Sequence, residues 1–390
     1  MHQAHDTELH TTEVLIVGGG PAGLAASIAL SQRGIDCTVV EARPPAIDKA
    51  CGEGLMPDSR DILAQLGVTL ENCDGYLFRG IRFANDSHRV DAHFPNGTGI
   101  GVRRPRLHAL LTERAQQAGA RLLFNTRVQL PADEFSTRDA GGYQTATING
   151  EPIRFRYLIG ADGQASSVRK WAGLDDTRKS SFRYGFRTHY RVAPWSAYAE
   201  IHWGTNGQLY VTPVAPDCVC VIYITRDPHF DRANILDGFP EIKARLLGAD
   251  IASQQRGAVS ATRKLRRVAT ETVALIGDAS GSADAITGEG LAISFRQALA
   301  LAQAIASGSL ESYNHAHRQI GRLPHAMGAL MLTLDRWPAF QRRALSALAH
   351  NPAVFHELLQ AHVGHRKLAA VLLRRAPAFA WKLIPQGTTA

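Results

Sequence analysis

Three glycines near the amino end of the chain have the spacing of a phosphate-binding turn. They are Gly18, Gly20 and Gly23, in the stretch Gly18-Gly19-Gly20-Pro21-Ala22-Gly23. The first glycine allows a tight turn, the second lets a pyrophosphate approach the backbone, and the third lets a helix pack closely on a strand. The amino end of that helix offers free N–H groups to phosphate. This spacing predicts a dinucleotide site.

An acidic residue follows at the distance that ribose recognition requires. Glu41 stands 18 residues after Gly23 and can accept hydrogen bonds from the diol of an adenosine ribose. An acid at this position, rather than a basic residue, favours FAD or NAD over NADP.

The elements that must position these residues are a strand, a helix and a second strand. Residues 14–17 form a short apolar run that is typical of a buried parallel strand. A helix is predicted over residues 24–32, ending at Gly34, and a second strand over residues 37–40. The glycine turn therefore lies where a Rossmann-like unit needs it.

Two later strands are also predicted to end in turns that contain aspartate and glycine. Residues 157–160 lead into Asp162-Gly163, and residues 273–276 lead into Gly277-Asp278. The side chain of Asp278 is expected to bind the ribityl hydroxyls of a flavin. A long helix is then predicted from Leu291 onward.

The turn before that helix is Thr287-Gly288-Glu289-Gly290. The amino end of the helix would stabilise negative charge on a reduced flavin ring. A simple NAD dehydrogenase does not need this second anion site, so the pattern favours FAD.

In this order, the motifs resemble the para-hydroxybenzoate hydroxylase superfamily of FAD-dependent monooxygenases, over about residues 13–310. The stretch Cys51-Gly52-Glu53-Gly54-Leu55-Met56-Pro57 and the turn before Leu291 are most similar to the geranylgeranyl reductase branch. One departure is Ala285, where this family usually has a proline, and its absence is expected to loosen the loop beside the flavin.

The resemblance also implies that an arginine in an Arg-x-x-Leu frame contacts FAD. Arg104 fits this frame, with Arg103 and Arg106 as alternatives. The complete set of predicted cofactor-binding residues is Gly18, Gly20, Gly23, Glu41, Arg104, Asp162, Gly163, Gly277, Asp278, Gly288, Gly290 and Leu291.

Two residues of the Cys51–Pro57 stretch are candidates for catalysis. Cys51 either donates a proton near the flavin or packs as a small apolar residue. Glu53 lies between two glycines and is either an acid or base of the active site or a solvated loop charge.

Residues 181–227 are rich in β-branched and aromatic side chains and alternate in character, which predicts an antiparallel sheet that faces the substrate. The candidate substrate contacts are His189, His202, Trp203 and Tyr210, although each residue type is more often used for packing.

The predicted fold class is α/β (α+β): a Rossmann-like FAD-binding domain with an inserted antiparallel β-sheet substrate domain and a C-terminal helical segment. After a flexible N-terminus at 1–12, the FAD-binding domain takes residues 13–70, 100–178 and 262–325. The substrate domain takes 71–99 and 179–261, and the C-terminal helical region takes 326–390.

The C-terminal region carries much of the positive charge. The whole chain has a formal net charge of +8, and eight basic residues against two acidic ones follow Ala326. Either these are solvated arginines on packed helices, or they form a peripheral membrane contact through which a lipophilic substrate enters. They could also attract an anionic nicotinamide. His350, His356, His362 and His365 in this region are interpreted as helix surface, and no metal site is predicted.

The composition excludes several classes of protein. With 390 residues, 45% hydrophobic and 20% charged, the chain is not a disordered, collagen-like or disulfide-rich scaffold. Five cysteines without a CxxC pair favour a reducing compartment, and the polar N-terminus is not a secretory signal. No transmembrane segment or nucleic-acid module is predicted, so the expected location is cytoplasmic, with possible peripheral contact at the inner face of a membrane.

These observations and the resemblance together predict an FAD-dependent oxidoreductase. The leading hypothesis is a monooxygenase that hydroxylates or epoxidises an aromatic or polyene-like lipophilic substrate through a flavin C4a-hydroperoxide. The chain has no second glycine motif of this type, so NAD(P)H is expected to bind transiently as reductant. The alternatives are a geranylgeranyl reductase-like enzyme that reduces isoprenoid double bonds, a flavin-dependent halogenase, and a noncatalytic lipid-binding relative.

Overall fold

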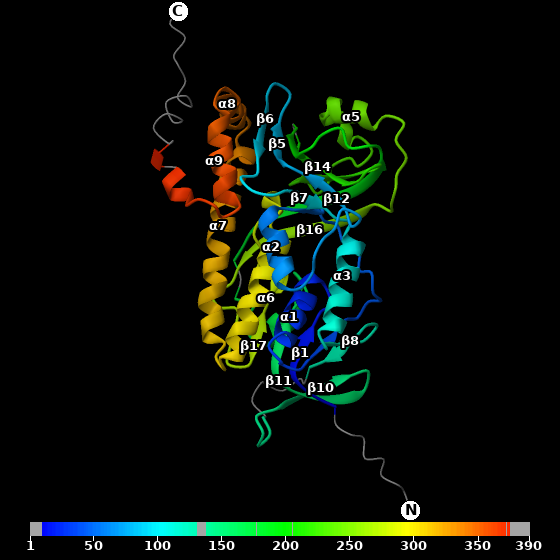
Figure 1. The fold of residues 1–390 in the computed structure, drawn as a ribbon, viewed down its shortest axis with the longest axis vertical. Coiled ribbons are helices and arrows are strands. Elements are labelled where there is room, and N and C mark those ends of the chain that lie inside the picture. The colour runs from blue at the N-terminus through cyan, green and yellow to red at the C-terminus, as the bar shows by residue number, and fades with distance from the viewer. Residues whose placement is uncertain (1–9, 131–137, 177, 205, 372, 375–390) are drawn as a thin grey trace, which may run out of the picture.

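A computed structural model describes residues 10–130, 138–176, 178–204, 206–371, 373 and 374. The first sheet lies in the lower half of Figure 1. Its strand order is β8 (Arg121–Leu123), β2 (Cys37–Val40), β1 (His10–Val17), β11 (Glu151–Gly160), β10 (Gln144–Ile148) and β9 (Val128–Gln129), and β17 (Val273–Leu275) also pairs with β11. Strands β8, β2, β1, β11 and β17 are parallel.

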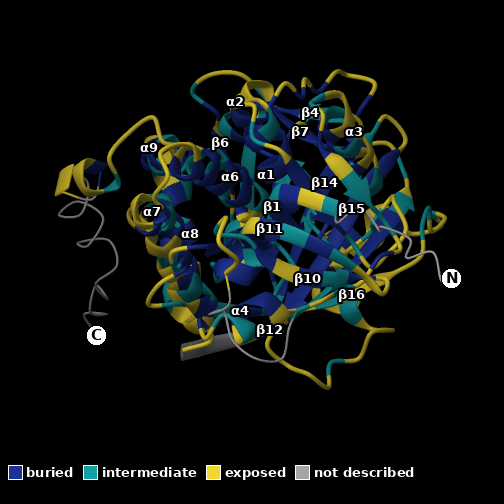
Figure 2. Cartoon of the chain, turned by 90° about the horizontal axis from the view of Figure 1, so that it is seen from below, coloured by how far each residue is buried: buried dark blue, intermediate teal, exposed yellow. Residues whose placement is uncertain are grey.

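Helices cover this parallel sheet. Helix α1 (Pro21–Ser31) packs against α3 (Arg104–Gln117) and α6 (Gly290–Ala306). Most of α1 is buried because its residues are small or apolar, and Figure 2 shows this part of the molecule as mostly buried. The result is the Rossmann-like arrangement that the sequence predicts.

The second sheet lies in the upper half of Figure 1. Its order is β16 (Arg256–Lys264), β12 (Arg178–Arg191), β15 (Cys218–Thr225), β14 (Gln208–Ala215), β13 (Ala199–Trp203), β5 (Gly80–Ala84) and β6 (Arg89–His93). All pairs are antiparallel except β13 with β5. One face, here called the outer face, is covered by the 3-10 turn η1 (Ile235–Gly238) and α5 (Pro240–Leu246). The opposite face is called the inner face.

A small third sheet joins the two larger ones. It consists of β3 (Gly54–Leu55), β7 (Gly99–Gly101) and β4 (Tyr76–Phe78). It packs on β14 so closely that a Cβ at Gly101 would lie 1.8 Å from the carbonyl oxygen of Pro213. The remaining short elements are α2 (Pro57–Gln65), α4 (Ser167–Trp171), η2 (Gly277–Ser280) and η3 (Ala285–Thr287).

Three helices complete the chain: α7 (Glu311–Arg336), α8 (Pro338–His350) and α9 (Pro352–His362). Helix α7 runs along one side of the molecule, and α8 and α9 lie beside β6 of the second sheet (Figure 1). The predicted boundary between residues 325 and 326 therefore falls inside one continuous helix, which spans both halves of the molecule.

Some predicted details fall differently in the structure. Residues 10–12 belong to β1 rather than to a flexible terminus, because their backbones pair with β11, and residues 1–9 lie outside the described residues. All five cysteines are free. Within the described ranges, no helix is long and apolar enough to cross a membrane.

Candidate functional site

The turns that follow the parallel strands come together at one edge of the first sheet. Strands β1, β2, β11 and β17 are parallel neighbours and end at Val17, Val40, Gly160 and Leu275. The N–H of Gly18 donates to Val40 at 2.8 Å, which fixes the glycine turn against β2. In doubly wound folds, this edge is where nucleotides bind.

The glycine turn has two sites where a side chain cannot fit and one that is open. Gly18 has φ +112°, and a Cβ there would lie 2.3 Å from the carbonyl oxygen of Ala161. A Cβ at Gly23 would lie 1.9 Å from the carbonyl oxygen of Gly18. A Cβ at Gly20 would meet nothing within 4 Å. Gly18 and Gly23 therefore serve the packing of the protein, whereas Gly20 faces space at the amino end of α1.

The carboxylate of Glu41 is held at the end of β2 by backbone donors. It accepts hydrogen bonds from the N–H of Gly19 at 2.8 Å and of Arg43 at 3.0 Å. From α3, the Nε2 atom of His108 lies 2.9 Å from the carbonyl oxygen of Gly19. Burial lowers the pKa of His108, so a neutral imidazole supports the turn.

Two aspartates lie at the ends of β11 and β17. One oxygen of Asp162 accepts from the N–H and hydroxyl of Ser167 at 2.7 and 2.9 Å and so caps α4. Its other oxygen is buried without a hydrogen-bond partner among the described residues. Asp278 is partly exposed and forms an ion pair with Lys49 at 3.4 Å. A Cβ at Gly277 would lie 2.8 Å from that of Ala22, so this turn lies against the start of α1.

The three neighbouring arginines have different surroundings. Arg106 forms an ion pair with Asp74 at 2.6 Å. The Nη1 atom of Arg104 lies 3.9 Å from the sulfur of Cys51. The Nε atoms of Arg103 and Arg104 are buried and have no hydrogen-bond partner among the described residues. Arg106 is therefore paired with Asp74, and Arg103 and Arg104 are the remaining candidates for a cofactor contact.

These residues fit FAD. The open side of Gly20, the unpaired oxygen of Asp162 and the unpaired Nε of Arg104 provide space, an acceptor and a donor. Buried polar atoms in native proteins nearly always have partners, and a bound dinucleotide would supply them here.

The start of α6 lies where the sequence predicts it. Helix α6 begins at Gly290, one residue before Leu291, and Gly288 adopts a left-handed conformation with φ +66°. Ala285 stands where the family usually has proline, and the preceding Asp284 accepts from the N–H of Ile286 at 3.1 Å and pairs with Arg183 at 2.9 Å. The expected loosening of this loop stays a prediction.

Glu53 is a buried hub and not a solvated loop charge. One oxygen accepts from the N–H of Arg104 at 2.9 Å and from Nη1 of Arg187 at 3.2 Å, and the other lies 2.6 Å from Nε2 of His189. The side chains of Glu53, Arg187 and His189 are all 0% exposed. Asp48 also pairs with Arg187, at 2.6 Å. This leaves open the acid or base role but excludes the solvated alternative, because water does not reach the carboxylate.

The hub joins the Cys51–Pro57 stretch to β12. Arg187 was not singled out from the sequence, although it stands two residues before His189 and therefore shares its face of the strand. The thiol of Cys220 lies beside the hub, and burial raises its pKa well above the usual value. Glu53, His189 and Cys220 have the ligand types of a metal site. The adjacent guanidinium of Arg187 satisfies the carboxylate instead and opposes a cation.

The predicted substrate residues divide between the two faces of the second sheet. His189, Trp203 and Tyr210 lie on the inner face. The hydroxyl of Tyr210 donates to the carbonyl oxygen of Ile286 at 2.9 Å, so β14 meets the loop before α6. Trp203 packs edge-on against Phe83, with ring centroids 4.9 Å apart, in the apolar cluster under α8 and α9.

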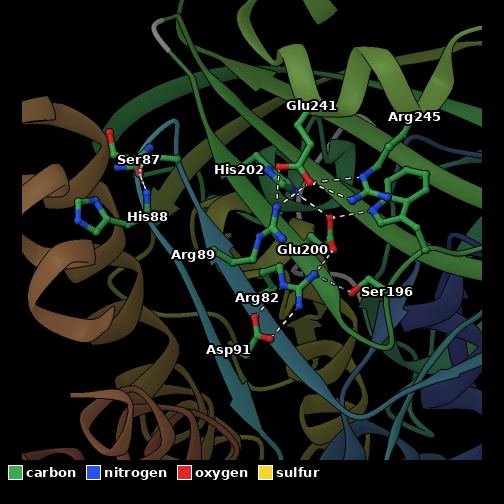
Figure 3. A network of polar contacts seen from close by, with 12 residues as sticks. Arg82, Ser87, His88, Arg89, Asp91, Ser196, Glu200, His202, Glu241 and Arg245 are labelled. Atoms are coloured by element: carbon green, nitrogen blue, oxygen red, sulfur yellow. Dashed lines mark hydrogen bonds and ion pairs between the residues drawn. The ribbon is translucent and has the colours of Figure 1, made fainter. Parts of the chain in front are cut away.

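His202 lies on the outer face, in the network of Figure 3. Its Nε2 is 2.9 Å from Glu200, which also accepts from Arg82 at 3.0 Å and Trp195 at 3.2 Å. Burial opposes ionisation of Glu200, but the hydrogen bond from His202 and the charge of Arg82 lower its pKa to about 2. The structure therefore does not bring His202 together with the other three residues.

Comparison with known families gives one match over most of the chain. Residues 11–319 match a family described as "FAD binding domain". The matched region contains the glycine turn, Glu41, Arg104, Asp162, Asp278 and the start of α6.

Three curated proteins are similar over most of the chain. A dialkyldecalin synthase from Streptomyces rugosporus is 27% identical over 93% of this chain and 79% of its own length. A 6-methylpretetramide 4-monooxygenase from Streptomyces rimosus is 28% identical over 74% of both chains. A menaquinone reductase from Mycolicibacterium smegmatis is 25% identical over 83% of this chain and 85% of its own length.

Solved structures confirm the fold. A flavoprotein/dehydrogenase from Cytophaga hutchinsonii superposes with a TM-score of 0.81 at 16% identity, over 95% of this chain and 99% of that one. A geranylgeranyl bacteriochlorophyll reductase-like protein from Thermoplasma acidophilum gives 0.72 at 21% identity, over 96% and 100%. The predicted combination of a Rossmann-like domain, a second sheet and C-terminal helices is therefore a known architecture.

Proposed function

Because this chain belongs to the FAD-binding-domain family, we propose that it is an FAD-dependent monooxygenase that takes electrons from NAD(P)H and acts on a lipophilic aromatic or polyene-like substrate. FAD as cofactor and the class of flavin-dependent oxidoreductases follow from the family. The reductant, the substrate and the transfer of oxygen are the proposed part.

The proposed contacts fall into two groups, one for the adenosine and pyrophosphate part of FAD and one for the ribityl chain and the flavin ring. Gly20 and the amino end of α1 would hold the pyrophosphate, with Gly18 shaping the turn, and Glu41 would accept from the adenosine ribose. The carboxylate of Asp278 would give up its ion pair with Lys49 and accept hydrogen bonds from the ribityl hydroxyls. The amino end of α6, at Gly290, would stabilise negative charge on the ring. When bound, FAD supplies two-electron chemistry and reaction with oxygen, while these residues orient it and exclude water.

The observation that carries the proposal is the contact between Tyr210 of β14 and Ile286, just before α6. It places the inner face of the second sheet beside the loop that leads to the proposed ring site. The cross-strand neighbours of Tyr210 on the inner face are Ile201 and Ile222, which would contact the apolar part of a substrate. Charged and polar groups also surround Tyr210, namely Gln208, Arg183, Asp284 and Asp335. The similarity to a 6-methylpretetramide 4-monooxygenase supports oxygenation.

A second candidate is reduction of a double bond in an isoprenoid substrate. The similarity to a menaquinone reductase over most of both chains favours it. In both candidates the same sheet and loop would hold the substrate against the flavin, so the fold does not distinguish them.

Isotope-labelled oxygen gas separates these reactions. The FAD-loaded protein would be incubated under labelled oxygen with NAD(P)H and panels of polycyclic aromatic and polyprenyl compounds. The masses of the products would then be measured by mass spectrometry. Incorporation of one labelled oxygen atom supports the monooxygenase. A product that gains two hydrogen atoms without oxygen overturns it in favour of the reductase. An isomerised product of unchanged mass also overturns it and points to the synthase-like relative.

Stopped-flow absorbance gives an independent readout. Anaerobically reduced holoprotein is mixed with oxygenated buffer in the presence of a substrate found in that panel. A transient flavin–oxygen adduct before the oxidised spectrum returns is expected. Direct return without an adduct would contradict oxygen transfer.

We also propose that the basic C-terminal region contacts an anionic membrane surface through which a lipophilic substrate enters. Arg336, Arg342, Arg343, Arg366, Lys367 and Arg374 are all exposed, whereas Arg375 and Lys382 lie outside the described residues. Exposed cations near an anionic bilayer each contribute about 1 kcal/mol to attraction.

A further inference from the structure

Glu289, the residue that directly precedes α6, is a buried acid without a hydrogen-bond partner. It is 1% exposed, and neither carboxylate oxygen receives a hydrogen bond from the described residues. The side chain of His362, at the end of α9, lies 3.7 Å from it, between Nδ1 and Oε2. This nitrogen also has no hydrogen-bond partner in the described part of the chain. Two buried polar groups from distant segments therefore face each other.

The other charged groups around Glu289 balance each other. Asp58 at the start of α2 forms an ion pair with Arg296 of α6, and both act electrostatically on Glu289. His362 of α9 completes the set. Asp58 and Arg296 neutralise each other. Glu289 and His362 are therefore either an ion pair of carboxylate and imidazolium or a neutral pair of carboxyl group and imidazole.

Burial decides in favour of the neutral pair. It raises the pKa of Glu289 to about 8 and lowers the pKa of His362 to about 4. At neutral pH the carboxyl group keeps its proton and the imidazole has a free acceptor nitrogen. At 3.7 Å the carboxyl group and Nδ1 of His362 are in contact but beyond hydrogen-bond distance, so the neutral imidazole covers the carboxyl group without adding a charge beside it. His362 is only 13% exposed, so the interpretation of this histidine as helix surface is wrong.

Because Glu289 lies at the amino end of α6, its protonation state changes the electrostatic potential that the helix presents to a bound cofactor. A negative charge at the amino end of a helix lies next to the positive end of its dipole and reduces the positive potential that the helix presents. In its protonated form Glu289 leaves that potential available to a ring bound in front of α6. A side chain that only packed there would need no acid and no facing imidazole.

We propose that Glu289 and His362 are a positioning pair for FAD: the neutral His362 side chain covers Glu289 and keeps it in its protonated form, and this keeps the amino end of α6 positive toward the flavin. Helix α9 is thereby part of the cofactor site. This inference rests on FAD binding by the family and not on oxygen transfer, so it stands whether the enzyme oxygenates or reduces its substrate.

The pair also couples proton uptake by Glu289 to the reduction of the flavin. Negative charge gained by the flavin on reduction strengthens the hold of Glu289 on its proton. Above about pH 8, where Glu289 has lost its proton in the oxidised protein, reduction therefore draws one proton from solvent to this carboxylate. The proton comes from water and the electrons from the reductant.

Infrared spectroscopy of the holoprotein tests the pair directly. The carbonyl stretch of a protonated carboxyl group is expected at pH 7, fading with a midpoint near pH 8, and absent in Glu289→Gln. In His362→Ala the midpoint should fall toward the ordinary pKa of a glutamate, because removing the covering imidazole lets water reach the carboxyl group. His356→Gln is the matched control: it lies on the same helix but bonds the carbonyl oxygen of Pro352 at 3.0 Å.

The reduction potential of bound FAD gives the second readout. Wild type should take up one more proton for each two electrons than Glu289→Gln between about pH 8 and pH 9. Identical pH dependence in the two proteins, or a carbonyl band that persists in Glu289→Gln, would overturn the proposal. Since Gln has the size of Glu, this result stands even if His362→Ala does not fold. Failure of the oxygen-labelling experiment alone would leave the pair untouched.

Discussion

At the scale of single residues, Glu53 shows how a loop position gains a fixed role. It adopts φ +59°, a conformation that non-glycine residues rarely adopt, and its carboxylate is enclosed by Arg104, Arg187 and His189. Such backbone strain persists where surrounding contacts hold the residue in place, and it is frequent in active sites. Glu53 therefore connects the Cys51–Pro57 stretch to the inner face of β12.

Replacing Glu53 by alanine should destabilise the protein strongly. The change leaves His189 and the N–H of Arg104 without their carboxylate acceptor, while Arg187 keeps its ion pair with Asp48. Buried polar groups that lose a partner in this way cost about 1–3 kcal/mol. Urea unfolding of the holoprotein measures the loss. Glu113→Ala is the control, because Glu113 lies on α3 in an exposed hydrogen bond with Gln117. A loss below about 1 kcal/mol for Glu53→Ala would show that the hub does not stabilise the fold.

Glu289 should make the stability of the protein depend on pH. Its pKa is raised from 4.5 to about 8 in the folded state, so its contribution to stability is complete below pH 4.5 and is lost as the pH rises through 8. At pH 9 this difference corresponds to at most about 5 kcal/mol. Urea unfolding at a series of pH values should show a steeper decline for wild type than for Glu289→Gln. Parallel curves would contradict a raised pKa.

At the scale of elements, the β1–turn–α1 unit contains glycines with two different roles, one in close backbone packing and one beside open space. Gly23 is required because the backbone of Gly18 leaves no space for a side chain, whereas Gly20 borders open space with an extended backbone, φ −71° and ψ 176°. Gly23 thus serves folding, whereas Gly20 leaves open the space where we propose that the pyrophosphate binds.

Alanine at these two positions should therefore have opposite effects. Gly20→Ala should leave the unfolding free energy of the apoprotein within about 0.5 kcal/mol but weaken FAD binding at least about tenfold, since the methyl group takes the space of the pyrophosphate. Gly23→Ala should destabilise the apoprotein by about 1–3 kcal/mol through overpacking. Urea unfolding and titration of FAD fluorescence measure the two effects. Unchanged FAD affinity in Gly20→Ala would place the cofactor elsewhere.

At the scale of the whole molecule, buried charges join three parts of the chain. Arg183 of β12 pairs with Asp284 beside η3 at 2.9 Å and with Asp335 near the end of α7 at 2.7 Å. Gln208 of β14 donates to Asp335 at 2.9 Å. The second sheet, the loop before α6 and the C-terminal helices are therefore held as one unit. Glu289 and His362 add a second connection on the same side.

The basic C-terminal region should give the whole molecule a salt-dependent attraction to anionic lipid. In vesicle flotation, binding to vesicles with phosphatidylserine should exceed binding to neutral vesicles and fall as the salt concentration rises, because salt screens exposed charges. Charge reversal at the exposed Arg342 and Arg343 should weaken binding. Arg33→Glu, on the opposite part of the chain at the end of α1, is the control. Equal binding to both vesicle types would contradict the proposal.

The sequence alone determined the cofactor half of the protein. Gly18, Gly20, Gly23 and Glu41 act through backbone geometry over a short stretch of chain, and short-range geometry is visible in residue spacing. Strand β2 has the predicted bounds, and α6 begins one residue before the predicted start. The family match agrees with this part of the analysis.

Only the tertiary structure decided which distant residues meet. Periodicity places His189 and His202 in strands, but strand pairing puts one on the inner face and the other on the outer face. Glu53 is buried because β12 lies over it, and His362 is buried because α9 returns to the start of α6. Burial and charge balance depend on neighbours that are far apart along the chain, and no local pattern in the sequence specifies them.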